Sequence, residues 1–362
     1  MLRPVVLALA VLALGACTDL NSGIAGTVVD AHVVRVIATD SRTLPGAERS
    51  QLYQRLELEL DGSLFRGEHV EVEWGGVRAL NSGGLLHPGD RVLLTVAREG
   101  DVRTYAIAEV VRLPSLLPLA VLLVVTLLAV ARMRGLAALT GLAASIAVFL
   151  LAIVPALQRG DDPLIATVLG SIAVLIVAVF VVHGFGRKSV AALGGTVAGL
   201  IVVGGLGAIA LGLARMTGFS SEESIFLSVA TDGRVDIARL ALAGVIVGSL
   251  GALVDMSIGQ SSTTFELAGV DPDLRGRALY LSALNVGRDH IGSLINTLAL
   301  AYFGGALPLV VFLSLGYQPL SVALNSEAMV ESIVTVLVAS VGLVLAVPVT
   351  TAFAVYLLRE RT

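Results

Sequence analysis

Acidic and amide side chains stand inside strongly apolar segments in the second half of the chain. Asp255 lies near the end of one apolar run, residues 237–258. A second polar set repeats at intervals of four, four and three residues: Asn285, Asp289, Ser293 and Asn296. An ionised carboxylate at the centre of a membrane helix costs about 2.5–3.5 kcal/mol. These residues therefore need a protein partner, a proton or water, and they are candidates, together with Arg288, for binding a substrate or a coupling proton.

On a helix, the second set forms a single polar stripe that lipid cannot solvate. We therefore expect the stripe to face the interior of a helical bundle. Local alternatives stay open: after a helix break at Gly287, Asp289 would cap a new helix, and Arg288 would be an ordinary positive flank of a membrane span. Asp255 lies near the end of one apolar run and Arg288 just before the start of the next, so both are expected at the same face of the membrane. An ion pair between them is therefore a further hypothesis.

Three glycines precede Asp255 on the same helical stripe. Gly244, Gly248 and Gly251 are spaced by four and three residues, and Asp255 follows four residues later. Small residues at such intervals let the backbone of another helix approach closely. This pattern predicts helix packing rather than contact with a ligand.

The remaining composition excludes several classes of function. The single cysteine rules out a disulfide framework, and the five histidines form no HExxH or related zinc motif, so we expect no metal and no cofactor. The net charge is −4, and the sequence has no basic cluster of the kind that binds nucleic acid. An intramembrane enzyme is the weakest hypothesis, because Asp236 and Asp255 lie about 28 Å apart along one helix. We therefore expect no catalytic residues.

Charge is distributed unevenly along the 362 residues. Residues 1–112 carry 11 basic and 14 acidic side chains, whereas the following 250 residues carry 13 and 14. The second part contains seven apolar runs long enough to cross a bilayer. They are residues 113–131, 135–157, 164–183, 190–214, 237–258, 291–316 and 332–358. The sequence predicts a polytopic α-helical membrane protein with about seven spans over residues 113–362.

Arginine and lysine indicate the orientation of these spans. Nine basic residues fall in loops and ends on one face and four on the other, so the first face is expected to be cytoplasmic. This places the C-terminus in the cytoplasm and residues 18–112 outside it. We expect the protein to lie in the cytoplasmic (inner) membrane of a bacterium.

Residues 1–17 resemble a signal peptide or signal anchor. A short apolar run ends in Leu14-Gly15-Ala16-Cys17, which is similar to a bacterial lipobox and makes Cys17 a candidate for lipidation. The following residues, 18–112, alternate between apolar and polar types in five segments separated by turn residues. The segments are 26–38, 52–60, 69–74, 92–97 and 105–111. We expect a small N-terminal all-β extracytoplasmic domain, an OB-like fold or small barrel, that could bind an envelope protein.

The membrane part resembles the YibE/F-like family of bacterial multi-pass membrane proteins. The resemblance covers roughly residues 114–358. It rests on GSLGALVDMSI at 248–258, GRD at 287–289, NTLALAY at 296–302, Leu307-Pro308, Asn325, Glu327, Glu331 and Pro348. This chain differs from the family pattern at His290, where an apolar residue is usual, at Ser293, where threonine is usual, and in its lipobox. The resemblance implies an architecture and no established reaction.

Polar residues inside the predicted membrane spans, in a sequence without a nucleotide-binding motif, favour a secondary transporter or permease of unknown substrate. Such a transporter could be coupled to protons. The alternative is a non-catalytic membrane scaffold or envelope sensor, whose polar residues only hold helices together. In both cases the lipid bilayer is a partner, and a transporter would also bind a small solute or ion.

Overall fold

The computed structural model describes residues 27–43, 50–62, 65–75, 80, 82–99, 102–317 and 319–359. The chain divides into two compact units, one that contains the β-strands and extends to Ala129, and one that begins at Val130. The signal peptide and Cys17 lie outside the described residues.

The first unit contains the five strands that the alternation predicts. They are β1 (Thr27–Thr43), β2 (Ser50–Leu60), β3 (His69–Trp74), β4 (Arg91–Glu99) and β5 (Val102–Val110). They form one antiparallel sheet in the order β3-β2-β1-β4-β5. Residues 27–32 of β1 pair with β4, and residues 31–43 pair with β2, so the pairing with β2 extends the strand beyond its predicted end at residue 38. Two register shifts along its pairing with β2, near Val33 and Val36, mark irregularities of the kind that bend a strand.

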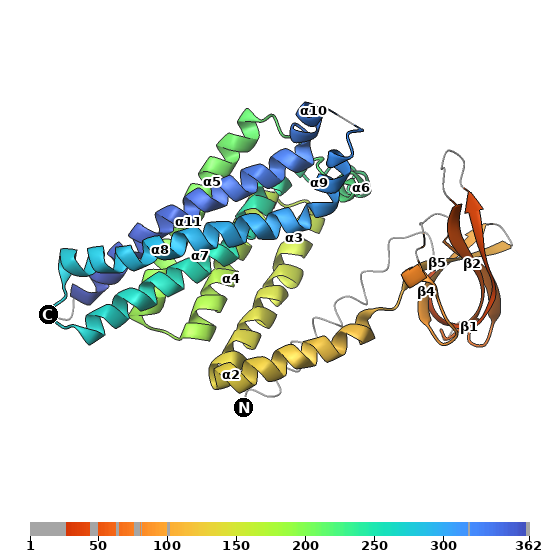
Figure 1. Ribbon diagram of the computed structural model, residues 1–362, viewed down its shortest axis with the longest axis horizontal. Coiled ribbons are helices and arrows are strands. Elements are labelled where there is room, and N and C mark those ends of the chain that lie inside the picture. Colours follow the sequence, from red (N-terminus) through yellow and green to blue (C-terminus); the bar gives the residue numbers. More distant parts are fainter. Residues whose placement is uncertain are drawn as a thin grey trace. The chain divides into compact units, whose positions relative to one another are not determined.

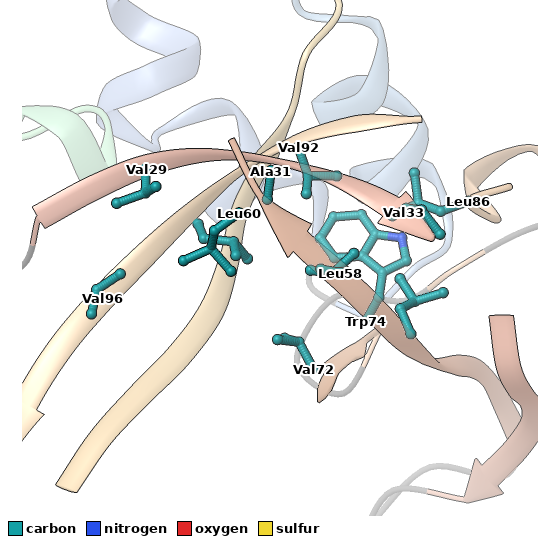
Figure 2. Packing of buried hydrophobic residues seen from close by; sticks show 12 residues of the cluster. Val29, Ala31, Val33, Leu58, Leu60, Val72, Trp74, Leu86, Val92 and Val96 are labelled. Carbon is teal, nitrogen blue, oxygen red and sulfur yellow. The ribbon is translucent and has the colours of Figure 1, made fainter. Parts of the chain in front are cut away.

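This sheet is a β half-barrel around an apolar core. Figure 2 shows the side chains of Val29, Leu58, Trp74 and Val92 among the residues gathered on its inner side. The Trp74 ring nitrogen donates a hydrogen bond to the Gly84 carbonyl, at 2.9 Å. The two edge strands are linked through Glu68, which accepts a hydrogen bond from the Tyr105 hydroxyl at 2.9 Å. The more specific expectation of an OB-like fold stays a prediction.

The helical part contains the following elements: α2 (Leu113–Val148), a π-helical turn η2 (Phe149–Ile153), α3 (Val154–Gln158), α4 (Pro163–His183), α5 (Arg187–Leu213), α6 (Glu222–Ala230), α7 (Ile237–Val270), α8 (Gly276–Gly305), α9 (Leu307–Ser314), α10 (Leu320–Leu324) and α11 (Glu327–Arg359). Within α2, Arg132 has non-helical dihedral angles, φ 54° and ψ −126°. Helix α2 is therefore interrupted between the first two predicted spans.

Five helical stretches among the described residues are long and apolar enough to cross a membrane: 113–158, α4, α5, α7 and α11. A sixth is obtained if α8 and α9, which meet at 66°, count as one bent span. The predicted span 291–316 is thus divided at Ala306. These apolar helices indicate a membrane-embedded protein, and the number of seven spans stays a prediction.

Helices α5, α7 and α11 pack together at the centre of the second unit, and α8 lies along α7 and α11 (Figure 1). Glycine allows the closest approach between α5 and α11. A Cβ atom on Gly195 would lie 1.7 Å from the Thr350 hydroxyl oxygen, and one on Gly342 would lie 3.2 Å from the Gly199 carbonyl oxygen. Small residues thus set this helix spacing, as is common between membrane helices.

The predicted glycine stripe on α7 packs only in part. A Cβ on Gly248 would lie 2.1 Å from the Tyr302 hydroxyl of α8, but one on Gly244 or Gly251 would have no heavy atom within 4 Å. The packing prediction is therefore wrong for Gly244 and Gly251 within the described chain. The helices that pack most closely on α7 contact its other faces, which carry larger buried residues such as Leu253 and Met256.

Candidate functional site

A polar cleft opens between α4, α5, α7 and the part of α2 that follows Arg132. Its volume is about 500 Å³. The polar side chains that line it are Arg134, His183, Lys188, Ser189, Ser262 and Glu266. Two glycines shape the turn that carries two of these residues: α4 ends at His183 before Gly184, whose φ is 78°, and Gly186 precedes α5 in an extended conformation. The short turn places His183 and Lys188 at the same end of the bundle.

Hydrogen bonds from two serines hold this turn in place. The Ser189 hydroxyl donates to the Gly184 carbonyl at 2.6 Å, and the Ser261 hydroxyl of α7 donates to the Lys188 carbonyl at 2.8 Å. The Lys188 ammonium forms an ion pair with Glu266 of α7 at 2.5 Å. Because both ends of that pair are exposed, it contributes little to stability but fixes charges at the cleft.

Asp255 lies on the face of α7 that carries Ser262 and Glu266, since the intervals of seven and four residues return to the same side of a helix. The charges of Asp255 and His183 act on each other, and Arg134 also acts on His183. A carboxyl group and an imidazole, both able to bind a proton and both exposed, therefore lie near each other. His183 lines the cleft, and Asp255 lies about one helical turn before its lining residue Ile258. Within the described residues, no group of three or more His, Cys, Asp and Glu side chains is arranged to hold a metal ion.

The hypothesis of an ion pair between Asp255 and Arg288 is wrong. The Arg288 guanidinium donates a hydrogen bond to the Asn285 side chain at 3.0 Å, within α8 itself. Asp255 instead has His183 as its electrostatic neighbour. The reason is the packing of α7, which presents Asp255 toward α4 and uses a different residue, Gln260, to contact α8.

The prediction that the α8 polar stripe faces the bundle is also wrong. Asn285, Asp289, Ser293 and Asn296 are all exposed in the chain, as are Arg288 and His290. The opposite side of α8 packs on α7 and α11 through Leu279, Ala283, Gly287 and Leu298. The helix runs without a break through Gly287, so Asp289 is not a helix cap.

Gln260 explains why this side of α8 is the buried one. Its side-chain amide donates to the Ala283 carbonyl at 2.9 Å and to the Thr351 hydroxyl at 2.7 Å. Gly287 leaves room for it, because a Cβ there would lie 2.6 Å from the Gln260 amide oxygen. A buried amide thus joins α7, α8 and α11, and sequence reasoning did not identify it.

The sequence profile of the YibE/F-like protein family matches residues 119–360, which is more than half of the chain. The chain belongs to the YibE/F-like family. The match confirms the resemblance that residues 248–258 and 287–289 indicate. No curated protein and no solved structure matches the chain.

In this YibE/F-like protein, α4, α5, α7, α8 and α11 all lie within the matched residues, whereas β1 to β5 precede them. The cleft is therefore built from the family part of the chain. His183, Lys188 and Glu266 are members of the cleft that sequence reasoning missed. Their position was the available signal, because each is predicted to lie at the same face of the membrane as Asp255.

Proposed function

We propose that this protein is a secondary transporter or permease for a small solute or ion, and that Asp255 and His183 carry a coupling proton. The observation that supports the proposal most is the proximity of these two proton-binding groups beside a polar cleft in a bundle of apolar helices. Ionisable residues inside membrane helices commonly mark substrate paths and proton relays.

Histidine suits this role because its charge changes between about pH 5 and 8. A proton bound by the pair would neutralise Asp255 or charge His183, and either change alters how the cleft attracts an ion. The exposed Lys188–Glu266 pair lies at the same cleft and can exchange one partner for a charged solute. Its two charges of opposite sign favour neither a cation nor an anion as the substrate.

The α8 stripe does not enter this mechanism within a single copy of the chain. Asn285, Arg288, Asp289, Ser293 and Asn296 lie on the exposed side of α8, away from its contact with α7. Of the six coupling candidates, we therefore retain only Asp255, which lies beside the cleft and near its lining residue His183. We retain, as part of the proposal, a location in the bacterial inner membrane with residues 18–112 outside the cytoplasm and available to an envelope partner.

The test is current from proteoliposomes on a solid support during jumps of pH, common cations and small metabolites. Wild type is compared with Asp255→Asn and His183→Gln at equal folded protein. Asp273→Asn is the matched control, because Asp273 is exposed in the loop between α7 and α8. We expect wild type and the control to give current for at least one solute and both site variants to lose it. Equal currents from all four proteins would contradict the role of the pair, and silence from folded wild type would favour the scaffold alternative.

A further inference from the structure

Between residues 285 and 296, helix α8 directs polar residues outward and apolar residues toward the bundle, the reverse of what a lipid environment requires. At 100° per residue, Asn285, Gly292 and Asn296 lie nearly opposite Ala283, Gly287 and Leu298, which face the bundle. Arg288 and Asp289 flank the outward polar face, one on each side of it. All five residues of this face, which we call the α8 polar face, are exposed.

The described chain supplies no partner for the carboxylate of this face. Among the residues that the structure describes, Asp289 forms no hydrogen bond or ion pair, and the partner seen for Arg288 is its own neighbour Asn285. Charged groups of membrane helices are nearly always paired or directed to protein or water. The α8 polar face therefore requires protein or water as its cover.

Other apolar segments of the same chain are poorly suited to that role. Residues 113–131 offer only Ser115 and Thr126 as polar side chains, and the run Pro4–Ala16 has none. Neither segment carries a charge that could pair with Asp289 or Arg288.

We propose that the α8 polar face is the interface between two copies of this chain. In a symmetric dimer, two copies inserted with the same orientation are related by a two-fold axis perpendicular to the membrane, and such an axis makes a surface meet itself. The left flank of one α8 then faces the right flank of the other. Because Arg288 and Asp289 occupy opposite flanks, each arginine meets the aspartate of the second copy, and two ion pairs form.

The centre of the face fits the same arrangement. The Asn296 amide both donates and accepts, so it can bond to Asn296 of the second copy, as polar residues at helix interfaces do. A Cβ on Gly292 would have no heavy atom within 4 Å, so this glycine leaves room for a second backbone. The face is thus complementary to itself in charge, hydrogen bonding and shape. This interface is independent of transport, and it would stand if the protein carried no solute.

Charge reversal tests the interface in the full chain in nanodiscs, with subunits counted by single-molecule photobleaching. Arg288→Asp or Asp289→Arg alone places like charges against each other, and we expect the dimer dissociation constant to rise at least about tenfold. Combining both substitutions in one chain exchanges the charges of the two flanks. Opposite charges then face each other again, so the dimer should be restored. The Arg288→Asp chain should also pair with the Asp289→Arg chain when both are expressed together, because their charges are opposite.

Disulfide formation gives a second measurement that does not depend on those variants. In a Cys17→Ser background, Asn285→Cys should form a disulfide-linked dimer when isolated membranes are treated with an added thiol oxidant. Val190→Cys is the control, since Val190 is exposed near the start of α5. A monomeric wild type, a dimer unaffected by single charge reversals, or crosslinks from residue 285 only to a different protein would overturn the proposal.

Discussion

Gln260 of α7 and Thr351 of α11 are joined by a 2.7 Å hydrogen bond in the buried centre of the helical unit, although the two residues are far apart in the sequence. The same amide reaches the backbone of α8 at Ala283. This contact helps to set the rotation of α8, together with the packing of Leu279, Gly287 and Leu298 on α7 and α11. That rotation leaves the α8 polar face pointing outward.

Replacement of Gln260 by leucine should therefore loosen the junction of the three helices. Interhelical hydrogen bonds in membrane proteins contribute about 0.6 kcal/mol on average and up to about 1.7. We expect Gln260→Leu and Thr351→Val each to lower the free energy of unfolding in detergent by about 1 kcal/mol. The double variant should lose less than the sum, because both changes remove the same bond. Additive losses, measured by circular dichroism during unfolding, would show that the bond contributes nothing.

Glycine at position 195 is required by its contact with α11. Alanine there would place its Cβ 1.7 Å from the Thr350 hydroxyl oxygen, and the helices would have to separate. We expect Gly195→Ala to lower the unfolding free energy by about 1–3 kcal/mol, the usual cost of overpacking. Gly244→Ala is the control, because a Cβ there meets nothing within 4 Å of the described chain. Equal thermal unfolding temperatures of the two variants in detergent would contradict this account of α5 and α11.

The elements of this fold were predictable from the sequence to a large extent, because they depend on local patterns. Alternation in segments such as 69–74 predicts the strands, and long apolar runs such as 164–183 predict the helices. The β1 strand exceeds its predicted length because its irregular pairing with β2 depends on a partner that is distant in the sequence.

The rotation and the neighbours of each helix were not predictable in the same way. Both sides of α8 are plausible interior sides by composition, since one is polar and the other contains Ala283 and Gly287. Contacts with α7 and α11 distinguish them, among them the hydrogen bond from Gln260 to the Ala283 carbonyl. The proximity of His183 to Asp255 likewise depends on the packing of α4 on α7, which no spacing within either helix reveals.

Asp162 combines two roles at the start of α4, and substitutions can separate them. Its carboxylate accepts hydrogen bonds from the backbone nitrogens of Leu164 and Ile165, at 2.9 and 3.2 Å, and it also pairs with Arg239 of α7. Asp162→Asn keeps a capping oxygen, so it and Arg239→Gln should each cost less than about 1 kcal/mol. Asp162→Ala should cost about 1 kcal/mol more than either, measured by unfolding in detergent. A loss from Asp162→Asn as large as that from Asp162→Ala would assign the effect to charge alone.

Glu57 in β2 should make the β half-barrel sensitive to acid. Hydrogen bonds from Arg35 and then His69, the latter at 3.0 Å, hold the pKa of this carboxyl below its ordinary value. A carboxyl whose pKa is lowered by folding stabilises the fold above its unfolded pKa, and this contribution disappears as the pH falls through the folded pKa. Wild type should therefore unfold at a higher temperature than Glu57→Gln at pH 7, and the difference should vanish at strongly acidic pH.

Trp74, the single tryptophan of the chain, reports this transition in the full-length protein, because it lies in the core of the half-barrel (Figure 2). Its fluorescence can be followed during heating at a series of pH values. Glu71→Gln is the control, since Glu71 is the cross-strand neighbour of Glu57 and forms no ion pair with the described residues. A difference between Glu57→Gln and wild type that stayed constant from neutral to strongly acidic pH would mean that the carboxylate charge of Glu57 does not stabilise the sheet.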